Sequence, residues 1–262
     1  TSTLSCPETS KKPPSPEALA TLPRIGKGDL PPRSVEVPVE TGSLAGVPVY
    51  NHPVFCGGIA YCDIGFDCTG MPDELVPYLP LYCELTTRCG AGGLTYLQMA
   101  KRISLATGGI GAGVSLTQRV DDPDVPAFRA FYHAKCLAHR FDEMLGVLRD
   151  LLLRPQLDDA KLIADIVLEM RNDMNSAVIS SGHNLAALNA ASRLSRNGLV
   201  AERLHGVEQL RFLDSLAQKK KPGDVVERLQ QLHSLLVGRQ RTVLSLTADT
   251  PDAHHAACTT LL

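Results

Sequence analysis

The sequence lacks the features that define several protein classes. It has no tryptophan and only 5% aromatic residues, which argues against a stacking surface for single-stranded nucleic acid. It has no excess of one charge, because 26 Lys and Arg against 28 Asp and Glu give a net charge of −2. Electrostatic attraction to nucleic acid or to an anionic membrane is therefore not expected. No apolar run approaches the about 18 residues that span a bilayer, so we expect neither nucleic acid nor membrane as a partner.

Motifs of self-contained catalysis or metal binding are also missing. The chain contains no H-E-x-x-H, H-x-x-E-H, G-x-S-x-G or C-x-x-C pattern. The glycine stretch Thr107 to Gly113 follows an expected helix and enters an expected strand, the reverse of a phosphate-binding loop. His205 to Gln209 matches H-x-x-E-H except that Gln replaces the second histidine, a chance match. The residues themselves predict no catalytic residue and no metal ligand.

The cysteines and the first residue bear on the origin of the chain. Cys56, Cys62 and Cys68 are six residues apart and form no zinc or redox pair, which favours free thiols in an intracellular or organellar compartment. A disulfide from Cys56 or Cys62 to a distant partner stays open. The chain opens on Thr1 without a basic and apolar leader, so we expect a processed product or a piece of a longer protein.

The composition that is present predicts a globular domain between two flanking segments. With 262 residues and 44% hydrophobic content, the chain is long enough to bury a core. Residues 1–33 are rich in proline and predict a linker, with a short helix capped by Ser15. Residues 34–249 carry the periodic patterns of a domain. Residues 250–262 are expected to be a tail or the start of another linker, with His254 and His255 as a solvated pair.

The period of the apolar residues alternates between the two of strands and the 3.6 of helices. Strands are expected at 35–39, 47–49, 60–68, 111–120, 128–136 and 242–247, the first two as an antiparallel pair. Helices are expected at 72–88, 94–106 and 141–152, from 158 onward, and at 182–198, 207–216 and 222–237. Ser181 is the expected N-cap and Gly198 the expected C-cap of the helix at 182–198. This order predicts an α+β fold in two layers, a mostly antiparallel sheet with helices packed on one face.

Several segments together resemble one family. They are GMPDELVPYLPLYCELTTRCG (70–90), ISLATGGIGAGVSL (103–116), SGHNLAALNAASRLSRNG (181–198) and GVEQLRFL (206–213). In matching order, they resemble the third domain of presequence-protease-type enzymes. These are pitrilysin-type (inverzincin) metallopeptidases, grouped with falcilysin-like proteases and, more distantly, insulysin. The resemblance covers 22–249.

The resemblance implies a non-catalytic part of a zinc enzyme. Such enzymes have four homologous α+β domains in two halves that close around a chamber, and the first domain holds zinc with H-x-x-E-H. In a register set on Cys89 and Gly90, the motif positions of this degenerate copy fall on Leu81, Glu84 and Leu85. Leucine cannot bind zinc, so this part is expected to hold no cofactor, with zinc confined to the parent enzyme.

Two functions follow as expectations. The resemblance implies a fragment of a zinc oligopeptidase that degrades short unstructured peptides, such as targeting peptides, in a mitochondrial or plastid-type organelle. This fragment would be an inactive chamber wall that contacts the N-terminal catalytic half and peptide substrates. The alternative is a stand-alone peptide-binding or scaffold module on the same fold. A cysteine hydrolase is a third hypothesis, and rapid labelling of one cysteine by iodoacetamide would reveal it.

Overall fold

The computed structural model describes residues 13–30, 32–33, 36–118, 122, 126–218 and 223–261. The chain divides into two units, 1–37 and 38–262. The first contains α1 (Pro16–Ala20) and the 3-10 helix η2 (Lys27–Asp29). Ser15 caps α1 as the sequence predicts, because its hydroxyl oxygen accepts a hydrogen bond from the Ala18 amide at 3.2 Å. Residues 1–12 of the expected linker lie outside the described residues.

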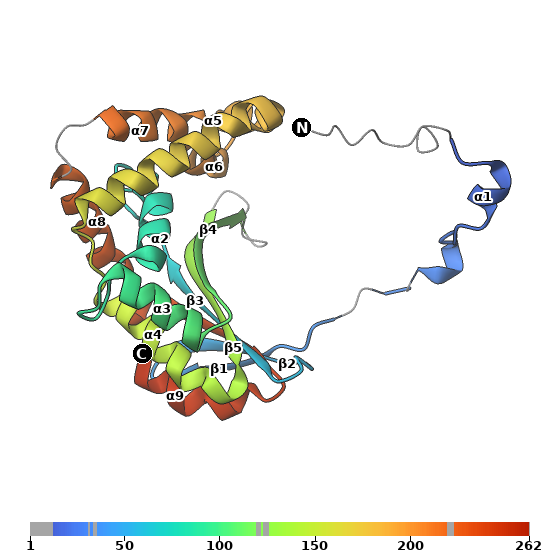
Figure 1. Cartoon of the computed structure of the whole chain (residues 1–262), viewed down its shortest axis with the longest axis horizontal. Coiled ribbons are helices and arrows are strands. Elements are labelled where there is room, and N and C mark those ends of the chain that lie inside the picture. Colours follow the sequence, from blue (N-terminus) through green and yellow to red (C-terminus); the bar gives the residue numbers. More distant parts are fainter. Residues whose placement is uncertain are drawn as a thin grey trace, which may run out of the picture. The chain divides into compact units, whose positions relative to one another are not determined.

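The second unit is built on a six-stranded mixed sheet (Figure 1). The strands are β1 (Glu40–Leu44), β2 (Val47–Pro53), β3 (Ile59–Asp67), β4 (Ile110–Gln118), β5 (Pro126–Leu137) and β6 (Thr242–Ala248). Their order is β1-β2-β6-β3-β5-β4, and every neighbouring pair is antiparallel except β2 with β6. The mostly antiparallel sheet of an α+β fold is therefore confirmed.

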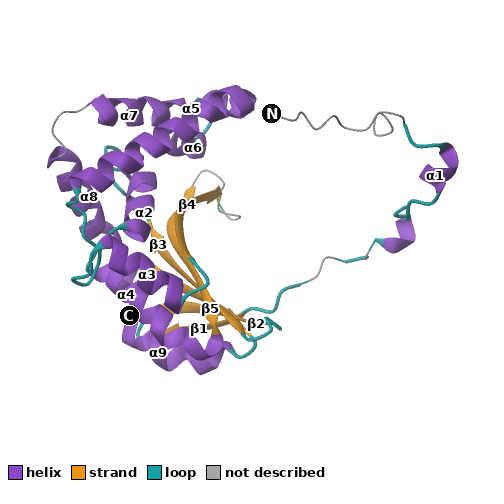
Figure 2. Cartoon of the chain, viewed as in Figure 1, coloured by secondary structure: helices purple, strands orange, loops and turns teal. Residues whose placement is uncertain are grey.

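Helices cover one face of this sheet (Figure 2). They are α2 (Leu79–Arg88), α3 (Tyr96–Ala106), α4 (Phe141–Leu153), α5 (Ala160–Ala191), α6 (Arg196–His205), α7 (Val207–Gln218), α8 (Gly223–Leu236) and α9 (His255–Leu261). Short 3-10 turns complete them: η3 (Val76–Tyr78), η4 (Ala138–Arg140), η5 (Arg239–Arg241) and η6 (Pro251–His254). Within the described residues, no helix is long and apolar enough to cross a membrane.

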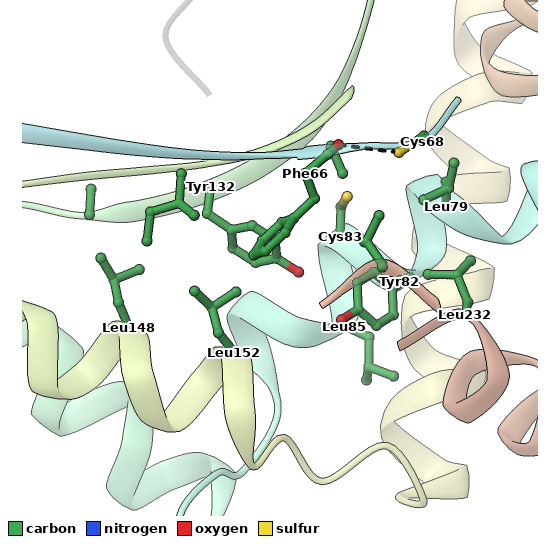
Figure 3. Packing of buried hydrophobic residues seen from close by; sticks show 14 of the residues in the cluster. Phe66, Cys68, Leu79, Tyr82, Cys83, Leu85, Tyr132, Leu148, Leu152 and Leu232 are labelled. Atoms are coloured by element: carbon green, nitrogen blue, oxygen red, sulfur yellow. Dashed lines mark hydrogen bonds between the residues drawn. The ribbon is translucent and has the colours of Figure 1, made fainter. Parts of the chain in front are cut away.

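The alternation of β3 sets which face is covered. Ala60, Cys62, Ile64, Phe66 and Cys68 are at most 3% exposed, as their pattern predicts. These side chains meet those of α2, α4 and α8 in one core (Figure 3). The seven described cysteines are free thiols, which confirms the interpretation of their spacing. Burial raises the pKa of Cys68 to about 12 and that of Cys89 to about 11, so neither is an activated nucleophile.

The first hairpin lies later in the chain than expected. Residue 35 of the strand predicted at 35–39 lies outside the described residues, and the rest of this prediction is wrong, because Val37 and Val39 are exposed and outside any strand. Instead Glu40–Leu44 pairs with Val47–Pro53. Ala45 and Gly46 have φ of 49° and 83°, the left-handed pair that a tight hairpin turn requires. The turn is thus shorter than the TGSLAG segment suggested.

The helix expected at 72–88 is shorter. The segment first makes the 3-10 turn η3, and α2 begins only at Leu79. Pro80 lies in the first turn of α2, where its missing N–H has no helical partner to lose. The acidic residues Asp73 and Glu74 therefore precede the helix.

The helix expected at 182–198 is wrong in both of its boundaries. Ser181 does not begin a helix but lies at a kink inside α5, with φ −136° and ψ 27°. Gly198 does not end one, because it lies within α6, which Ser195 caps. A Cβ atom at Gly198 would lie 2.1 Å from the Ala191 carbonyl oxygen. Glycine is needed at this position because α5 and α6 approach closely, a contact that the local pattern does not reveal.

The segment expected to be a tail belongs to the domain. Residues 251–261 form η6 and α9, and Cys258 is fully buried. The predicted solvated pair is also wrong: His254 stacks on Phe141 with ring centroids 4.0 Å apart, and the ring of His255 lies 3.1 Å from the Asn51 side-chain oxygen. These contacts join the segment to α4 and β2.

Candidate functional site

The three degenerate motif positions lie on α2 and point in different directions. Leu81 and Leu85 are fully buried, and Figure 3 shows Leu85 within the core. Glu84 is exposed, and its carboxylate lies 4.0 Å from the Arg88 guanidinium. Arg88 also pairs with Glu169 of α5 at 2.8 Å, and this hydrogen bond raises the pKa of Arg88 and lowers that of Glu169. Glu84 therefore belongs to a surface ion-pair cluster.

Zinc does not fit these positions. Two buried leucine side chains offer no lone pair to a metal, and the glutamate next to them faces solvent. Elsewhere in the described part of the chain, no group of three or more His, Cys, Asp or Glu side chains is placed to hold a metal ion.

The face of the sheet opposite the helices carries a broad hollow of about 570 Å³. We call this face the open face. Its polar and aromatic side chains around the hollow are Tyr50, His52, Asp63, Ser115, Arg129, Phe131, His133 and Ser245. They come from β2, β3, β4, β5 and β6, so every strand of the sheet except the edge strand β1 contributes.

The hollow exists because glycine occupies outward positions on two strands. Gly65 on β3 and Gly113 on β4 are both cross-strand partners of Phe131 on β5. A Cβ atom at Gly65 would lie 2.6 Å from the Phe131 ring, so this ring lies over the bare backbone of Gly65. The ring of His133 stacks on Phe131 at 15° with centroids 5.8 Å apart. The floor of the hollow is thus an aromatic platform between small residues.

An acid–histidine pair lies at the edge of this platform. His133 Nδ1 is 2.8 Å from Asp63 Oδ1, and the two residues are direct cross-strand partners. This resembles the acid and base of a catalytic triad, but among the described residues the hydrogen bond of His133 goes to Asp63 and none goes to a serine. The pair therefore fixes the orientation of His133 without activating a nucleophile.

Arg129 supplies positive charge at the large hollow of the open face. It lies between Asp67 of β3 and Ser115 of β4 in the register of the sheet. Its Nε atom is buried and has no hydrogen-bond partner. A buried guanidinium N–H without an acceptor is costly, and a ligand oxygen would satisfy it. The open face is therefore suited to polar contacts with a peptide backbone or carboxylate.

A buried hydrogen-bonded group lies on the opposite side of the sheet, beneath α2. The Tyr132 and Thr86 hydroxyl oxygens are 2.7 Å apart, and the Tyr82 hydroxyl lies 2.8 Å from His233 Nδ1 of α8. Burial raises the pKa of both tyrosines and lowers the pKa of His233. These groups are therefore neutral donors and acceptors that join α2, β5 and α8.

Part of the open face was visible in the sequence. The alternation assigns Asp63, Arg129 and His133 to the polar side of their strands, although it does not bring them together. Tyr50 and Ser245 were missed, because their approach depends on the parallel pairing of β2 with β6. Phe131 was missed because only the glycines on both sides of it reveal that its ring lies flat.

The fold is a mostly antiparallel sheet with helices on one face, and the described residues include no group of His, Cys, Asp or Glu placed to hold a metal ion. The model of the family described as peptidase M16 (subfamily C) associated matches residues 5–216. The chain belongs to this family, which confirms the resemblance to the non-catalytic part of presequence-protease-type enzymes.

Curated relatives extend well beyond this chain. Presequence protease 1, chloroplastic/mitochondrial, of Arabidopsis thaliana is 31% identical over 240 residues, which cover 90% of this chain and 22% of the relative. The mitochondrial presequence protease of Danio rerio is 26% identical over 227 residues, covering 87% of this chain and 22% of the relative. The chain thus spans 22% of the length of these relatives.

Solved structures support the fold. The chain is similar to a peptidase M16 inactive domain from Pseudomonas fluorescens with a TM-score of 0.57 and 15% identity, covering 86% of this chain and 50% of the other. It is also similar to a conserved protein from Enterococcus faecalis V583 with a TM-score of 0.62 and 11% identity, covering 85% and 52%.

Proposed function

We propose that this chain is an inactive wall of the chamber of a zinc oligopeptidase that degrades short unstructured peptides. The observation that carries this proposal is the open face, which has a hollow, an aromatic platform and polar side chains, with helices confined to the other face. A wall that contacts peptides of many sequences needs groups whose binding does not depend on the peptide sequence. Donors that bind the peptide backbone, next to an aromatic platform, are such groups.

The catalytic residues would come from the N-terminal half of the same protease, and zinc would be bound there. This division of labour is supported by membership of the family and by the buried leucines at positions 81 and 85. An organellar location is supported by the names of the relatives, which are called mitochondrial or chloroplastic. Free buried thiols are compatible with such a reducing interior.

Photo-crosslinking tests the role of the open face. Benzoylphenylalanine is placed at Tyr50, which lines the hollow and is 40% exposed, or at Tyr96 on α3, which is 47% exposed. An unstructured peptide of about 20 residues should crosslink at position 50 and not at position 96. Equal labelling at both positions, or none at position 50, would contradict the proposal.

Two further observations separate the enzyme from the alternative module. The purified chain should bind no stoichiometric zinc and cleave no peptide. Zinc-dependent cleavage that is lost on substitution of His205 would overturn the inactive assignment. An H-x-x-E-H motif elsewhere in the full open reading frame would support the peptidase, and its absence would favour a stand-alone peptide-binding or scaffold module.

A further inference from the structure

A second hollow of about 240 Å³ lies at one end of the open face. Ile59 and Leu137 are cross-strand partners, and so are Tyr61 and Lys135. Their even spacing along β3 and β5 places all four on the open face, next to the large hollow. Leu105 at the end of α3 and Arg140 of η4 form the other wall. We call this second hollow the end groove.

The end groove is lined by apolar side chains that remain in contact with water. Leu105 is 60% exposed, Leu137 is 53% exposed and Tyr61 is 38% exposed. Single exposed apolar residues are normal on a protein surface, but three around one hollow form a binding surface for another apolar group. The volume is below the about 300 Å³ at which sites for whole small molecules begin, so the groove fits one side chain.

A lysine without an acidic partner borders this apolar surface. In the part of the chain that the structure describes, no carboxylate lies within 4.0 Å of the Lys135 ammonium. Its stem is held in place, because a Cβ atom at Gly108 would lie 3.2 Å from Lys135 Cγ and the Gly108 amide donates to the Lys135 carbonyl at 2.7 Å. The stem of Lys135 is therefore held in position, and no described carboxylate pairs with its positive charge.

The other cation of the groove is already satisfied. Arg140 Nη2 lies 2.6 Å from the Glu143 carboxylate, and Arg140 Nη1 donates to the Leu105 carbonyl. These bonds hold the end of α3 against η4 and neutralise the guanidinium. The charge that the groove offers to a ligand is therefore that of Lys135.

We infer that the end groove binds the C-terminal residue of a peptide, through its apolar side chain and its terminal carboxylate. The apolar side chain covers Leu105, Leu137 and Tyr61, and the carboxylate pairs with Lys135. The C-terminal carboxylate lies two bonds from the Cβ atom of the same residue, so one residue supplies both groups within the reach of this small groove. The inference rests on the proposed function in one respect, namely that the ligand is a peptide.

Fluorescence anisotropy with three labelled peptides of about 12 residues tests the groove on the 262-residue chain. The first peptide ends in leucine with a free carboxylate, the second is its C-terminal amide, and the third is an amide with glutamate after the leucine. The first should bind saturably and the second should bind about tenfold more weakly. The third should bind as weakly as the second, and recovery of affinity by the third would overturn the assignment to a C-terminal residue.

Matched variants identify the residues. Leu105→Ser and Lys135→Glu should each weaken the first peptide about tenfold or more. The controls are Leu97→Ser, at a similarly exposed leucine of α3, and Lys101→Glu, at an exposed lysine of the same helix. Both controls should bind the first peptide with an affinity within about twofold of the wild type, because neither residue lines the groove. Circular dichroism shows whether Lys135→Glu folds. If it does not fold, Lys135→Gln, which keeps part of the side-chain stem, should also weaken binding of the first peptide.

Equal weakening by the control variants, or equal affinity for the free acid and the amide in wild-type chain, would overturn the inference. Its failure can be distinguished from failure of the proposed function. If peptide crosslinks at position 50 while Leu105→Ser and Lys135→Glu bind the first peptide normally, the inference about the end groove is wrong. The proposed function as a chamber wall is then unaffected. If peptide neither crosslinks at position 50 nor binds in solution, both are wrong.

Discussion

Asp150 shows how one side chain can hold three segments together. Its carboxylate on α4 is 7% exposed and accepts hydrogen bonds from Arg102 of α3, at 2.5 Å, and from Arg154. Gly92 lies against it, since a Cβ atom there would be 2.8 Å from Asp150 Cγ. Burial acts to raise the pKa of Asp150, but the hydrogen bonds and charges of the two arginines outweigh it and lower the pKa.

Asp150→Asn should destabilise the chain by about 1–3 kcal/mol, because two charge-assisted hydrogen bonds are weakened at a buried site. Urea denaturation at pH 7 measures this. Asp165→Asn, at an exposed aspartate of α5, should change stability by less than about 0.5 kcal/mol. Since the folded-state pKa of Asp150 is lowered, its contribution is present above about pH 4 and is lost as the pH falls further. A difference between variant and wild type that does not decrease as the pH falls below about 4 would contradict this account.

Among the elements, α9 has a larger structural role than its sequence suggests. Cys258 is fully buried, and α9 and α4 form the two walls of a groove that Gly146 and Ala256 help to line. A chain that ends at Asp249 should therefore lose about 3 kcal/mol or more, because the covered surface of α4 and β2 becomes exposed. Denaturation of the two chains compares them directly. An unchanged midpoint would restore the tail interpretation.

Two substitutions on α2 test whether this helix can bind zinc when the histidines of the H-x-x-E-H motif are introduced. Leu81→His with Leu85→His recreates H-x-x-E-H in the sequence, but both side chains enter the core instead of a site open to water. The double variant should be destabilised by about 2 kcal/mol or more and should bind no stoichiometric zinc, as measured by metal analysis and by thermal unfolding with added zinc. Glu84→Gln, at an exposed position, serves as the unperturbed control. Stoichiometric zinc binding by the double variant would show that α2 can turn this face outward.

The elements that could be predicted from the sequence are those whose signal is local. The apolar face of β3 and the helix α4 follow from periods of two and 3.6, and Ser15 caps α1 because capping needs only neighbouring residues. Contacts between distant segments gave no such signal. Gly198 serves the contact with α5, and the open face depends on β6 lying beside β2. The burial of α9 likewise depends on its contact with α4, so a short polar helix was taken for a tail.

At the scale of the whole molecule, half-buried histidines couple stability to pH. Burial lowers the pKa of His233, and it is the main cause of the lowered pKa of His254. A lowered folded-state pKa means that the unfolded chain binds protons first as the pH falls. Stability is therefore full above about pH 6.5 and decreases below it, by up to about 1.4 kcal/mol per pH unit for each proton.

Unfolding free energies measured from pH 7.5 to pH 5 check this prediction. His233→Asn should give a shallower pH dependence than the wild type, because one proton-binding difference is removed. His183→Gln, at an exposed position of α5, should leave the slope unchanged. The explanation fails if both variants keep the slope of the wild type.

The position of β6 has a consequence for how the chain is made. This strand lies between β2 and β3, yet it is supplied by residues 242–248, which follow all the other strands of the sheet in sequence. During synthesis the β1–β2 hairpin and the β3–β5–β4 sheet emerge as two separate pieces, each with an unpaired edge. Force measurements on ribosome-stalled chains should show cooperative folding only after β6 has left the ribosomal tunnel. The two pieces therefore remain unjoined and in need of protection until this strand of seven residues is made, after the other five strands of the sheet.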